Sequence, residues 1–511
     1  HGDELGDASF ARLAKEIDRI TTIGRQTPRR VRLARASGAQ VLSAPTELLA
    51  HLGRGQRSIP ALPTREELRR RGQDLRAACP RQSHATWRRA PDRRDPIDLL
   101  RQSSKGRIPE LIPVRYGRMV RSPLFFYRGA ALNMAADLAT TPATGLRVQA
   151  CGDCHLANFG AFGTPERRVI VDINDLDETL PAPWEWDVKR LATSFLLACR
   201  NNGHGRHVAR EAVLTCVRSY RERMAELSEL RVMELWYADT ALEQLIPTVE
   251  DAEARGRLRR RLKKARAQHI IDGDFPEVVK TTGGLPSIKE VPPLIFRLQT
   301  GPRDADATMI QRAFAAYRQS LPEHRRRLVE RFRLIDIAIK VVGVGSVGTR
   351  CFVMLLMAGE NDPLFLQVKE ARPSVLAPYA GKSQYASDGQ RIVTGHHLMQ
   401  TASDVFLGWT TGSGGRHFYV RQLKDMKIKP HVELFTPKVM LQYADLCARI
   451  LARAHARSGE PAVISGYLGR SESFDEAVAD FASAYADESE RDHEALVRAV
   501  RRGTLEADLD A

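Results

Sequence analysis

The sequence predicts an α+β fold in which a β-rich segment lies between two helical parts of the chain. The apolar spacing of helices dominates before about residue 333 and returns from Pro437. Between these parts, β-branched and apolar residues gather in short runs that are typical of strands. With 511 residues, 43% of them hydrophobic, the chain can bury more than one core.

Four segments follow from this pattern. Residues 1–105 form an Arg-rich helical extension, and residues 106–333 form a large helical part that carries the candidate site loops. Residues 334–430 are the β-rich part, and residues 431–511 are helices that return to the large helical part. The β-rich part therefore comes after the candidate catalytic loop in chain order.

The individual elements are expected from local periodicity and composition. In the first half, Ala130–Leu138 is expected to be a buried helix, Val169 begins a strand, and the segment Pro181–Leu191 starts a long helix that runs to about Arg200. In the second half, the expected strands are Ile335–Val342, Arg350–Met357, Pro363–Lys369 and His417–Leu423, and the expected helices are Val439–His455 and Phe474–Tyr485.

Charge and composition narrow the class of protein. No apolar run reaches the roughly 18–20 residues of a membrane span, and the acidic start lacks the apolar core of a signal peptide, so we expect a cytoplasmic protein. The seven cysteines are expected to be reduced thiols. A net charge of +16 attracts anions, so a nucleic-acid partner stays open. The basic run Arg255–Arg266 lacks interleaved aromatic residues, and a solvated helix face is the simpler interpretation.

The most informative segment is Cys151–Gly160, Cys-Gly-Asp-Cys-His-Leu-Ala-Asn-Phe-Gly. Asp153 followed five residues later by Asn158 matches the needs of phosphoryl transfer: a carboxylate that accepts the proton of an attacking hydroxyl, and an amide oxygen that holds Mg²⁺. His155 lies between them and is a third catalytic candidate. Cys151-x-x-Cys154-His155 is also a pattern for haem attachment or for zinc, and a capped structural turn is a further alternative.

An acidic run follows this loop at once. Asp172, Asp175 and Asp177 lie at the end of the expected strand, and Asp175 and Asp177 point the same way if the strand continues. Carboxylate oxygens suit Mg²⁺, which usually bridges to substrate phosphates. The sequence therefore predicts a metal site made of Asn158, Asp175 and Asp177, although a turn that caps the next helix remains an alternative.

A glycine-rich loop lies far downstream. Gly343, Gly345 and Gly348 form a complete G-x-G-x-x-G motif with Ser346 inside it. In a dinucleotide-binding fold, the motif ends a strand and opens a helix, with an acid such as Glu370 about 20 residues on. In a kinase, the loop joins two strands over the phosphates and the next strand carries a lysine, here Lys369.

These motifs together resemble the protein-kinase-like superfamily, especially the aminoglycoside phosphotransferases. The chain is also similar, over roughly residues 110–490, to an uncharacterised bacterial family called domain of unknown function 2252. The segments that carry this similarity are Phe126–Gly129, Cys151–Gly160, Asn174–Thr179, Pro183–Arg190, Val342–Arg350, Gln367–Ala371, Tyr419–Lys424 and Leu451–Ala456.

The resemblance assigns a role to each matching residue. Asp153 resembles the catalytic base, Asn158 and Asp175 resemble the metal ligands, and Lys369 resembles the lysine that pairs with phosphate. The loop from Gly343 to Gly348 resembles the loop that covers the nucleotide. Asp187 follows Asp175 by twelve residues, and it matches a helix aspartate that lies at a similar distance from the metal ligand in the phosphotransferases. No glutamate stands out as a partner for Lys369.

The resemblance implies a circularly permuted, two-lobed kinase-like fold, because the glycine loop and Lys369 follow the catalytic loop. It implies an ATP- and Mg²⁺-dependent phosphotransferase that acts on an unknown small-molecule or protein hydroxyl. A nucleotide-binding pseudokinase, an AMP-transferring enzyme and a basic nucleic-acid-binding protein are the alternatives. One consequence is specific: Lys369 should lie close to Asp175 in space.

Overall fold

The computed structural model describes residues 62–267, 279–282, 285–297, 303–341, 343–359, 362–423 and 426–509. Contacts divide the chain into two units, His1–Leu68 and Arg69–Ala511. The predicted N-terminal extension falls largely outside the described residues, as does part of the region 268–302. The second unit contains all of the candidate site residues, and helix α3 begins four residues before it, at Arg65.

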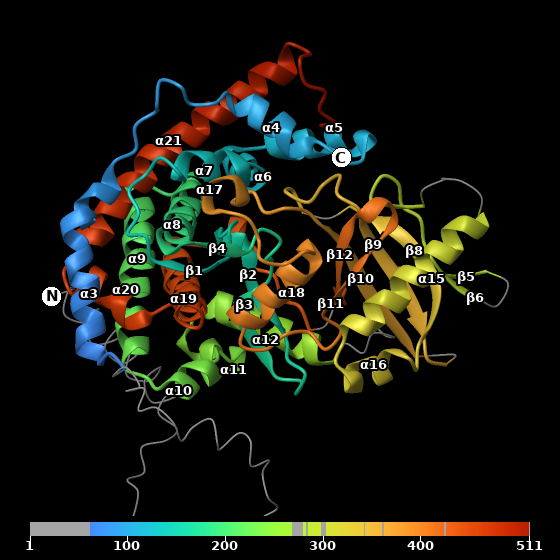
Figure 1. Ribbon diagram of the computed structural model, residues 1–511. Coiled ribbons are helices and arrows are strands. Elements are labelled where there is room, and N and C mark those ends of the chain that lie inside the picture. Colours follow the sequence, from blue (N-terminus) through green and yellow to red (C-terminus); the bar gives the residue numbers. More distant parts are fainter. Residues whose placement is uncertain are drawn as a thin grey trace, which may run out of the picture. The chain divides into compact units, whose positions relative to one another are not determined.

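The second unit is mixed α+β, with 54% helix and 15% strand in the chain. Its largest hydrophobic core forms among long helices that come from both ends of the chain. In Figure 1, helices α8, α9 and α19 run side by side. The principal helices of this part are α3 (Arg65–Ala78), α4 (Pro96–Ser104), α5 (Ile112–Val120), α6 (Pro123–Gly129), α7 (Ala131–Leu138), α8 (Trp184–Asn201), α9 (Arg206–Ser228), α19 (Pro437–Ala456), α20 (Pro461–Leu468) and α21 (Ser473–Arg501).

Several of these helices begin with the same local signal, a capping side chain followed by proline. Asp95, Ser122 and Thr436 each accept a hydrogen bond from a backbone N–H of the first turn of α4, α6 and α19. Proline fits the position after the cap because its missing N–H would have no partner inside the helix anyway. The local sequence therefore determines where these helices begin.

A six-stranded antiparallel sheet forms the β-rich part, in the order β11-β12-β10-β9-β8-β7. Helices α15 and α16 lie across it in Figure 1, and Tyr317, Leu321 and Val329 pack against its strands. The strands are β7 (Ile295–Phe296), β8 (Arg333–Lys340), β9 (Cys351–Met357), β10 (Pro363–Ala371), β11 (Gly408–Thr411) and β12 (His417–Gln422). The helices beside them are α15 (Arg303–Ser320), α16 (Glu323–Val329), α17 (Ala377–Ala380) and α18 (Asp388–Met399).

Three two-stranded sheets complete the strand pairing of the described residues, and two of them hold the predicted site loops. They pair β1 (Arg147–Ala150) with β4 (Leu180–Pro183), β2 (Phe159–Gly163) with β3 (Val169–Ile173), and β5 (Val279–Thr282) with β6 (Leu285–Ile288). The remaining helices are α10 (Val232–Tyr237), α11 (Leu242–Leu245), α12 (Ala252–Ala267) and the 3₁₀ turns η1 (Arg81–Ala85), η2 (Pro109–Leu111), η3 (Leu156–Asn158), η4 (Ile246–Thr248), η5 (Ser413–Gly415) and η6 (Val432–Leu434).

The expected strands and helices occur close to their predicted positions, but α21 is much longer than predicted. Apolar spacing predicts a helix that ends at Tyr485, whereas α21 continues to Arg501. The extra turns bury polar side chains: Glu488 and Asp492 both pair with Arg93 and are nearly inaccessible. A search for apolar spacing misses such turns. Among the described helices, none combines the length and apolar character needed to cross a bilayer.

Candidate functional site

The loop that carries Asp153 is fixed by a helix beneath it. Strand β1 ends at Ala150, and the backbone N–H groups of Cys151 and Gly152 donate to the Asp187 carboxylate of α8 at 2.6 and 3.0 Å. Gly152 has φ +83°, and a Cβ atom there would lie 2.4 Å from the Glu178 carbonyl oxygen. Only glycine fits this position without displacement of the backbone.

Asp187 is itself held by buried partners. His455 Nε2 lies 3.1 Å from Asp187 Oδ2, and Tyr220 Oη lies 2.9 Å from His455 Nδ1. All three side chains are almost inaccessible to solvent. The loop therefore rests on a chain of polar contacts through α8, α9 and α19, and a rigid support of this kind keeps a reactive side chain in place.

Asp153 faces the cavity while one of its oxygens is bound to an arginine. Arg190 Nε donates to Asp153 Oδ1 at 2.8 Å, and His155 Nε2 lies 4.0 Å from Asp153 Oδ2. Burial raises the pKa of Asp153 to about 6, although the Arg190 cation opposes the shift. Burial also lowers the pKa of His155, with the cations of Arg128 and Arg190 acting in the same direction. A neutral histidine thus lies beside a carboxyl group that ionises near neutral pH.

Asn158 is oriented by the same loop. Its Nδ2 donates to the Asp153 carbonyl oxygen at 2.7 Å, and the residue lines the cavity described below. The Asn158 carbonyl oxygen accepts the backbone N–H of Asn174 at 2.7 Å, so this residue also joins the loop to the end of β3. Strand β3 ends at Ile173, so Asp175 and Asp177 lie in the following loop and not on a continued strand.

Lys369 meets this acidic loop as the sequence predicts. Its Nζ lies 3.5 Å from Asp175 Oδ1 and 2.6 Å from Asp177 Oδ2, so the expected proximity is confirmed. Lys369 sits in β10, an interior strand, between Cys351 of β9 and Tyr419 of β12. Its side chain is buried, and burial alone would favour the neutral amine. The two carboxylates nevertheless hold the pKa of Lys369 well above its usual value.

The two carboxylates differ in their surroundings. Asp177 accepts from Lys369 on one oxygen and from the Tyr419 hydroxyl, at 2.7 Å, on the other. Burial opposes ionisation, yet Lys369 and Tyr419 lower the pKa of Asp177. Burial raises the pKa of Asp175, and the adjacent Asp177 charge adds to the shift. Asp177 therefore serves as the counter-ion of Lys369 that the sequence analysis looked for among glutamates.

The glycine loop joins two antiparallel strands, β8 and β9, and no helix follows it. This arrangement removes the dinucleotide-binding alternative, which requires a helix after the motif. Residues of the segment before α7 tie the loop down: Arg118 donates to the Gly343 carbonyl at 2.6 Å and Arg107 to the Val347 carbonyl at 2.5 Å. A Cβ atom at Gly345 would lie 3.3 Å from the Arg128 carbonyl oxygen, which shows how closely the loop approaches this segment.

These segments surround one cavity of about 730 Å³. Two predicted site residues, Lys369 and Gly348, do not line this cavity. Lys369 is connected to it through its ion pairs with Asp175 and Asp177. The Gly348 carbonyl oxygen accepts the backbone N–H of Ile108. The size falls within the range of small-molecule sites in proteins. The predicted site residues that line the cavity are Asp153, His155, Asn158, Asp175, Asp177, Gly343, Gly345 and Ser346.

A family model described as an uncharacterized protein conserved in bacteria, DUF2252, matches residues 107–499. The chain belongs to DUF2252. The matched region contains the whole cavity lining except for Gln102 and Ser103. No curated protein matches the chain, and no solved structure matches it.

The haem and zinc alternatives do not fit this DUF2252 protein. Cys151 and Cys154 have no exposed surface and belong to the large hydrophobic core, so there is no room beside them for a covalently attached haem. Within the described ranges, no group of three or more His, Cys, Asp or Glu side chains is placed to hold a metal ion by itself. All seven cysteines are free and buried.

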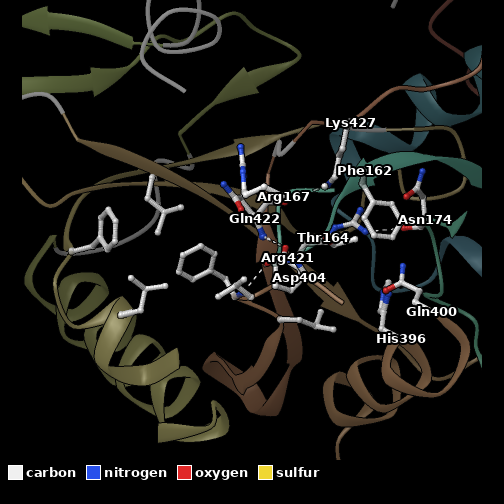
Figure 2. A pocket seen from close by; sticks show the side chains of 18 of the residues that line it. Phe162, Thr164, Arg167, Asn174, His396, Gln400, Asp404, Arg421, Gln422 and Lys427 are labelled. Carbon is white, nitrogen blue, oxygen red and sulfur yellow. Dashed lines mark hydrogen bonds between the residues drawn. The ribbon is translucent and has the colours of Figure 1, made fainter. Parts of the chain in front are cut away.

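A second, smaller cavity of about 280 Å³ lies behind the acidic loop. Figure 2 shows Arg421, Asp404 and Gln422 together in its wall, with Asn174, Gln400 and His396 nearby. Arg421 Nη1 donates to the Asn174 carbonyl oxygen at 2.8 Å, directly before Asp175. Arg421 thus positions the acidic loop from behind.

Sequence reasoning missed several residues of the site. Arg190, Tyr419 and Arg421 contact Asp153, Asp177 and the Asn174 carbonyl, respectively, but no role was predicted for them. Their only signal was membership of the segments Pro183–Arg190 and Tyr419–Lys424 that resemble the family. Their partners lie far away in the chain, so local spacing carries no information about them.

Proposed function

We propose that this DUF2252 protein is an ATP- and Mg²⁺-dependent phosphotransferase with a permuted, two-lobed kinase-like fold. In this proposal, the sheet β8–β12 is the small lobe and the helices around α8, α9 and α19 are the large lobe. The observation that carries the proposal is the contact of Lys369 with Asp175 and Asp177. This contact brings the strand after the glycine loop to the loops that hold Asp153, Asn158 and Asp175, beside one cavity.

The residues present fit a hard cation. Asn158 and Asp175 offer an amide oxygen and a carboxylate to the cavity, and Mg²⁺ usually takes one or two protein oxygens and completes its shell with phosphates and water. Asp177 is less suited, because both of its oxygens already have partners. When bound, Mg·ATP would supply the transferable phosphoryl group.

The chain's own residues then have separate tasks. Asp153 would accept a hydrogen bond from the acceptor hydroxyl and hold it for attack, and a carboxyl pKa of about 6 leaves it mostly ionised at neutral pH. Lys369 stays charged and, because it lies outside the cavity lining, would act by holding Asp175 and Asp177 in place beside the phosphates. The loop Gly343–Gly348 would cover the phosphates with backbone N–H groups.

Mg·ATP binding and turnover test this proposal. Wild type is expected to bind Mg·ATP and to hydrolyse or transfer its γ-phosphate slowly, with the rate falling as the pH drops below about 6. Asp153→Asn should keep binding within about threefold and lose turnover by at least about 100-fold. Label placed on the α or γ phosphate separates AMP transfer from phosphoryl transfer. A wild type that does not bind Mg·ATP contradicts the proposal.

A nucleotide-binding pseudokinase is the second candidate, and one contact favours it. Arg190 occupies one oxygen of Asp153 and lies almost fully buried beside it. An aspartate held in this way can be structural. In that case, Mg·ATP raises the melting temperature of wild type and of Asp153→Asn equally, and neither protein turns over.

A further inference from the structure

Three arginines converge at one end of the main cavity, on the C-terminal end of α4. Arg107 Nε and Arg372 Nη1 donate to the Ser103 carbonyl oxygen at 3.0 and 3.2 Å. Arg115 Nη2 donates to the Ser103 hydroxyl at 2.9 Å, and Arg372 Nη2 to the Lys105 carbonyl at 2.6 Å. All three arginines line the cavity.

None of the three forms an ion pair with a carboxylate of the described residues. Their partners are backbone carbonyls and serine hydroxyls: Arg107 also donates to the Val347 carbonyl, and Arg115 to the Gly129 carbonyl and the Ser104 hydroxyl. Arg115 is only 1% exposed, and its buried Nε has no hydrogen-bond partner. Arg107 and Arg372 are half-buried. Cations that are withdrawn from water are normally paired with carboxylates, so three guanidinium groups without a carboxylate partner at one site need an explanation.

The charges of the cluster repel one another. Burial lowers the pKa of Arg107 well below its usual value, and the neighbouring cations of Arg115 and Arg372 add to the shift. Burial is also the main cause that lowers the pKa of Arg115 to about 10, with a further contribution from Arg372. The folded protein therefore holds three positive charges together at a cost in free energy.

Nearby negative groups offset little of this charge. The C-terminus of α4 carries the equivalent of only about half a negative charge, against three positive charges. Glu178 also lines the cavity, but its Oε2 accepts the Val375 N–H at 2.7 Å. It lies beyond ion-pair distance of all three arginines, so one carboxyl group does not balance the cluster.

We propose that Arg107, Arg115 and Arg372 bind a phosphate group carried by the acceptor substrate. A phosphate brings two negative charges and several acceptor oxygens, and guanidinium groups match its geometry. The assignment to the acceptor rests on the proposed phosphotransfer, whereas the anion site itself does not. The cluster is separate from Lys369, whose charge is already balanced by Asp175 and Asp177. The acceptor is thus a phosphorylated metabolite or a phosphorylated chain.

Inorganic phosphate is the direct probe, because it needs no nucleotide. In calorimetry on the full chain at constant ionic strength, wild type is expected to bind phosphate, and Arg372→Gln to bind it at least about tenfold more weakly. Arg107→Gln provides a second test if Arg372→Gln folds poorly. The matched control is Arg101→Gln, which also removes one positive charge, at an exposed arginine of α4 that pairs with Asp98 outside the cavity. This variant should bind phosphate like wild type.

A parallel titration with Mg·ATP distinguishes the acceptor from the nucleotide. Arg372→Gln should bind Mg·ATP within about twofold of wild type. A tenfold loss of Mg·ATP binding would assign the cluster to the nucleotide and overturn the acceptor proposal, and equal phosphate binding by wild type, Arg372→Gln and Arg107→Gln would overturn the anion site. Phosphate binding without any Mg·ATP binding would contradict the phosphotransferase proposal and leave the anion site in place.

Discussion

At the scale of single residues, Asp153 combines two conflicting demands. A base must be free to accept a proton, yet Arg190 holds one of its oxygens, and the Arg190 guanidinium also donates to the Tyr127 carbonyl at 3.0 Å. Burial and the cation shift the pKa of Asp153 in opposite directions, and burial prevails. The second oxygen remains beside His155, so the pair orients Asp153 without closing it off.

Arg190→Met tests how much the fold depends on this pair. The change leaves the Asp153 carboxylate in its buried site without a counter-ion, and loss of one partner of a buried pair costs about 3–5 kcal/mol. Urea unfolding at pH 7.5 measures this cost. Arg498→Met is the matched control, since Arg498 pairs with Glu494 on the exposed face of α21 and should cost less than about 1 kcal/mol. Equal losses in the two variants would contradict a structural role for the buried pair.

At the scale of secondary structure, the site depends on short turns at strand ends. The catalytic loop follows β1, the acidic loop follows β3, and the glycine loop joins β8 to β9. These turns bring polar groups to the cavity while the strands bury apolar side chains. Function therefore resides in loops that a rigid scaffold positions.

Gly152→Ala tests the catalytic loop as a unit. The left-handed backbone alone costs about 1–2 kcal/mol for alanine, and the new Cβ atom would also clash with the Glu178 carbonyl at 2.4 Å. Gly145→Ala is a close control: Gly145 has nearly the same φ, +80°, but a Cβ atom there meets nothing within 4 Å. Unfolding free energies should show a larger loss for Gly152→Ala, by about 1 kcal/mol or more. Equal losses would mean that the loop adjusts freely.

Much of this local structure could be predicted from the sequence, because it depends on local chemistry. The β-branched run before Gly343 predicts β8, and the apolar spacing after Pro437 predicts α19. The spacing of Asp153 and Asn158 identified residues that do line one cavity. The counter-ion of Lys369 could not be predicted, because the acidic run placed Asp177 in the predicted metal site and its pairing with Lys369 depends on a contact between distant segments.

At the scale of the whole chain, Lys369 is the contact that joins the sheet to the acidic loop of the helical part. Its ammonium forms ion pairs with both Asp175 and Asp177. Tyr419 and Arg421 of β12 donate hydrogen bonds to the same loop. Without the lysine, two half-buried carboxylates would face each other at close range. Like charges raise the pKa of such a pair.

Lys369→Met should therefore destabilise the protein in a pH-dependent way. At pH 7.5, the loss is expected to be about 2 kcal/mol, which is less than for a fully buried pair because both charged carboxylates are only half-buried. In the variant, the raised carboxyl pKa means that the folded state binds more protons than the unfolded state, so its stability rises as the pH falls towards 5. Other carboxyl groups with raised pKa values, such as Asp153, affect wild type and the variant alike, whereas Lys369 and Asp177 stay ionised in wild type at both pH values. Urea unfolding at the two pH values should show the gap in unfolding free energy between wild type and variant narrowing by at least about 1 kcal/mol.

Lys382→Met, at an exposed lysine of the same cavity, is the control and should show a small loss of stability that does not change with pH. A loss from Lys369→Met that is equal at both pH values would mean that the carboxylates do not depend on this lysine for their charge.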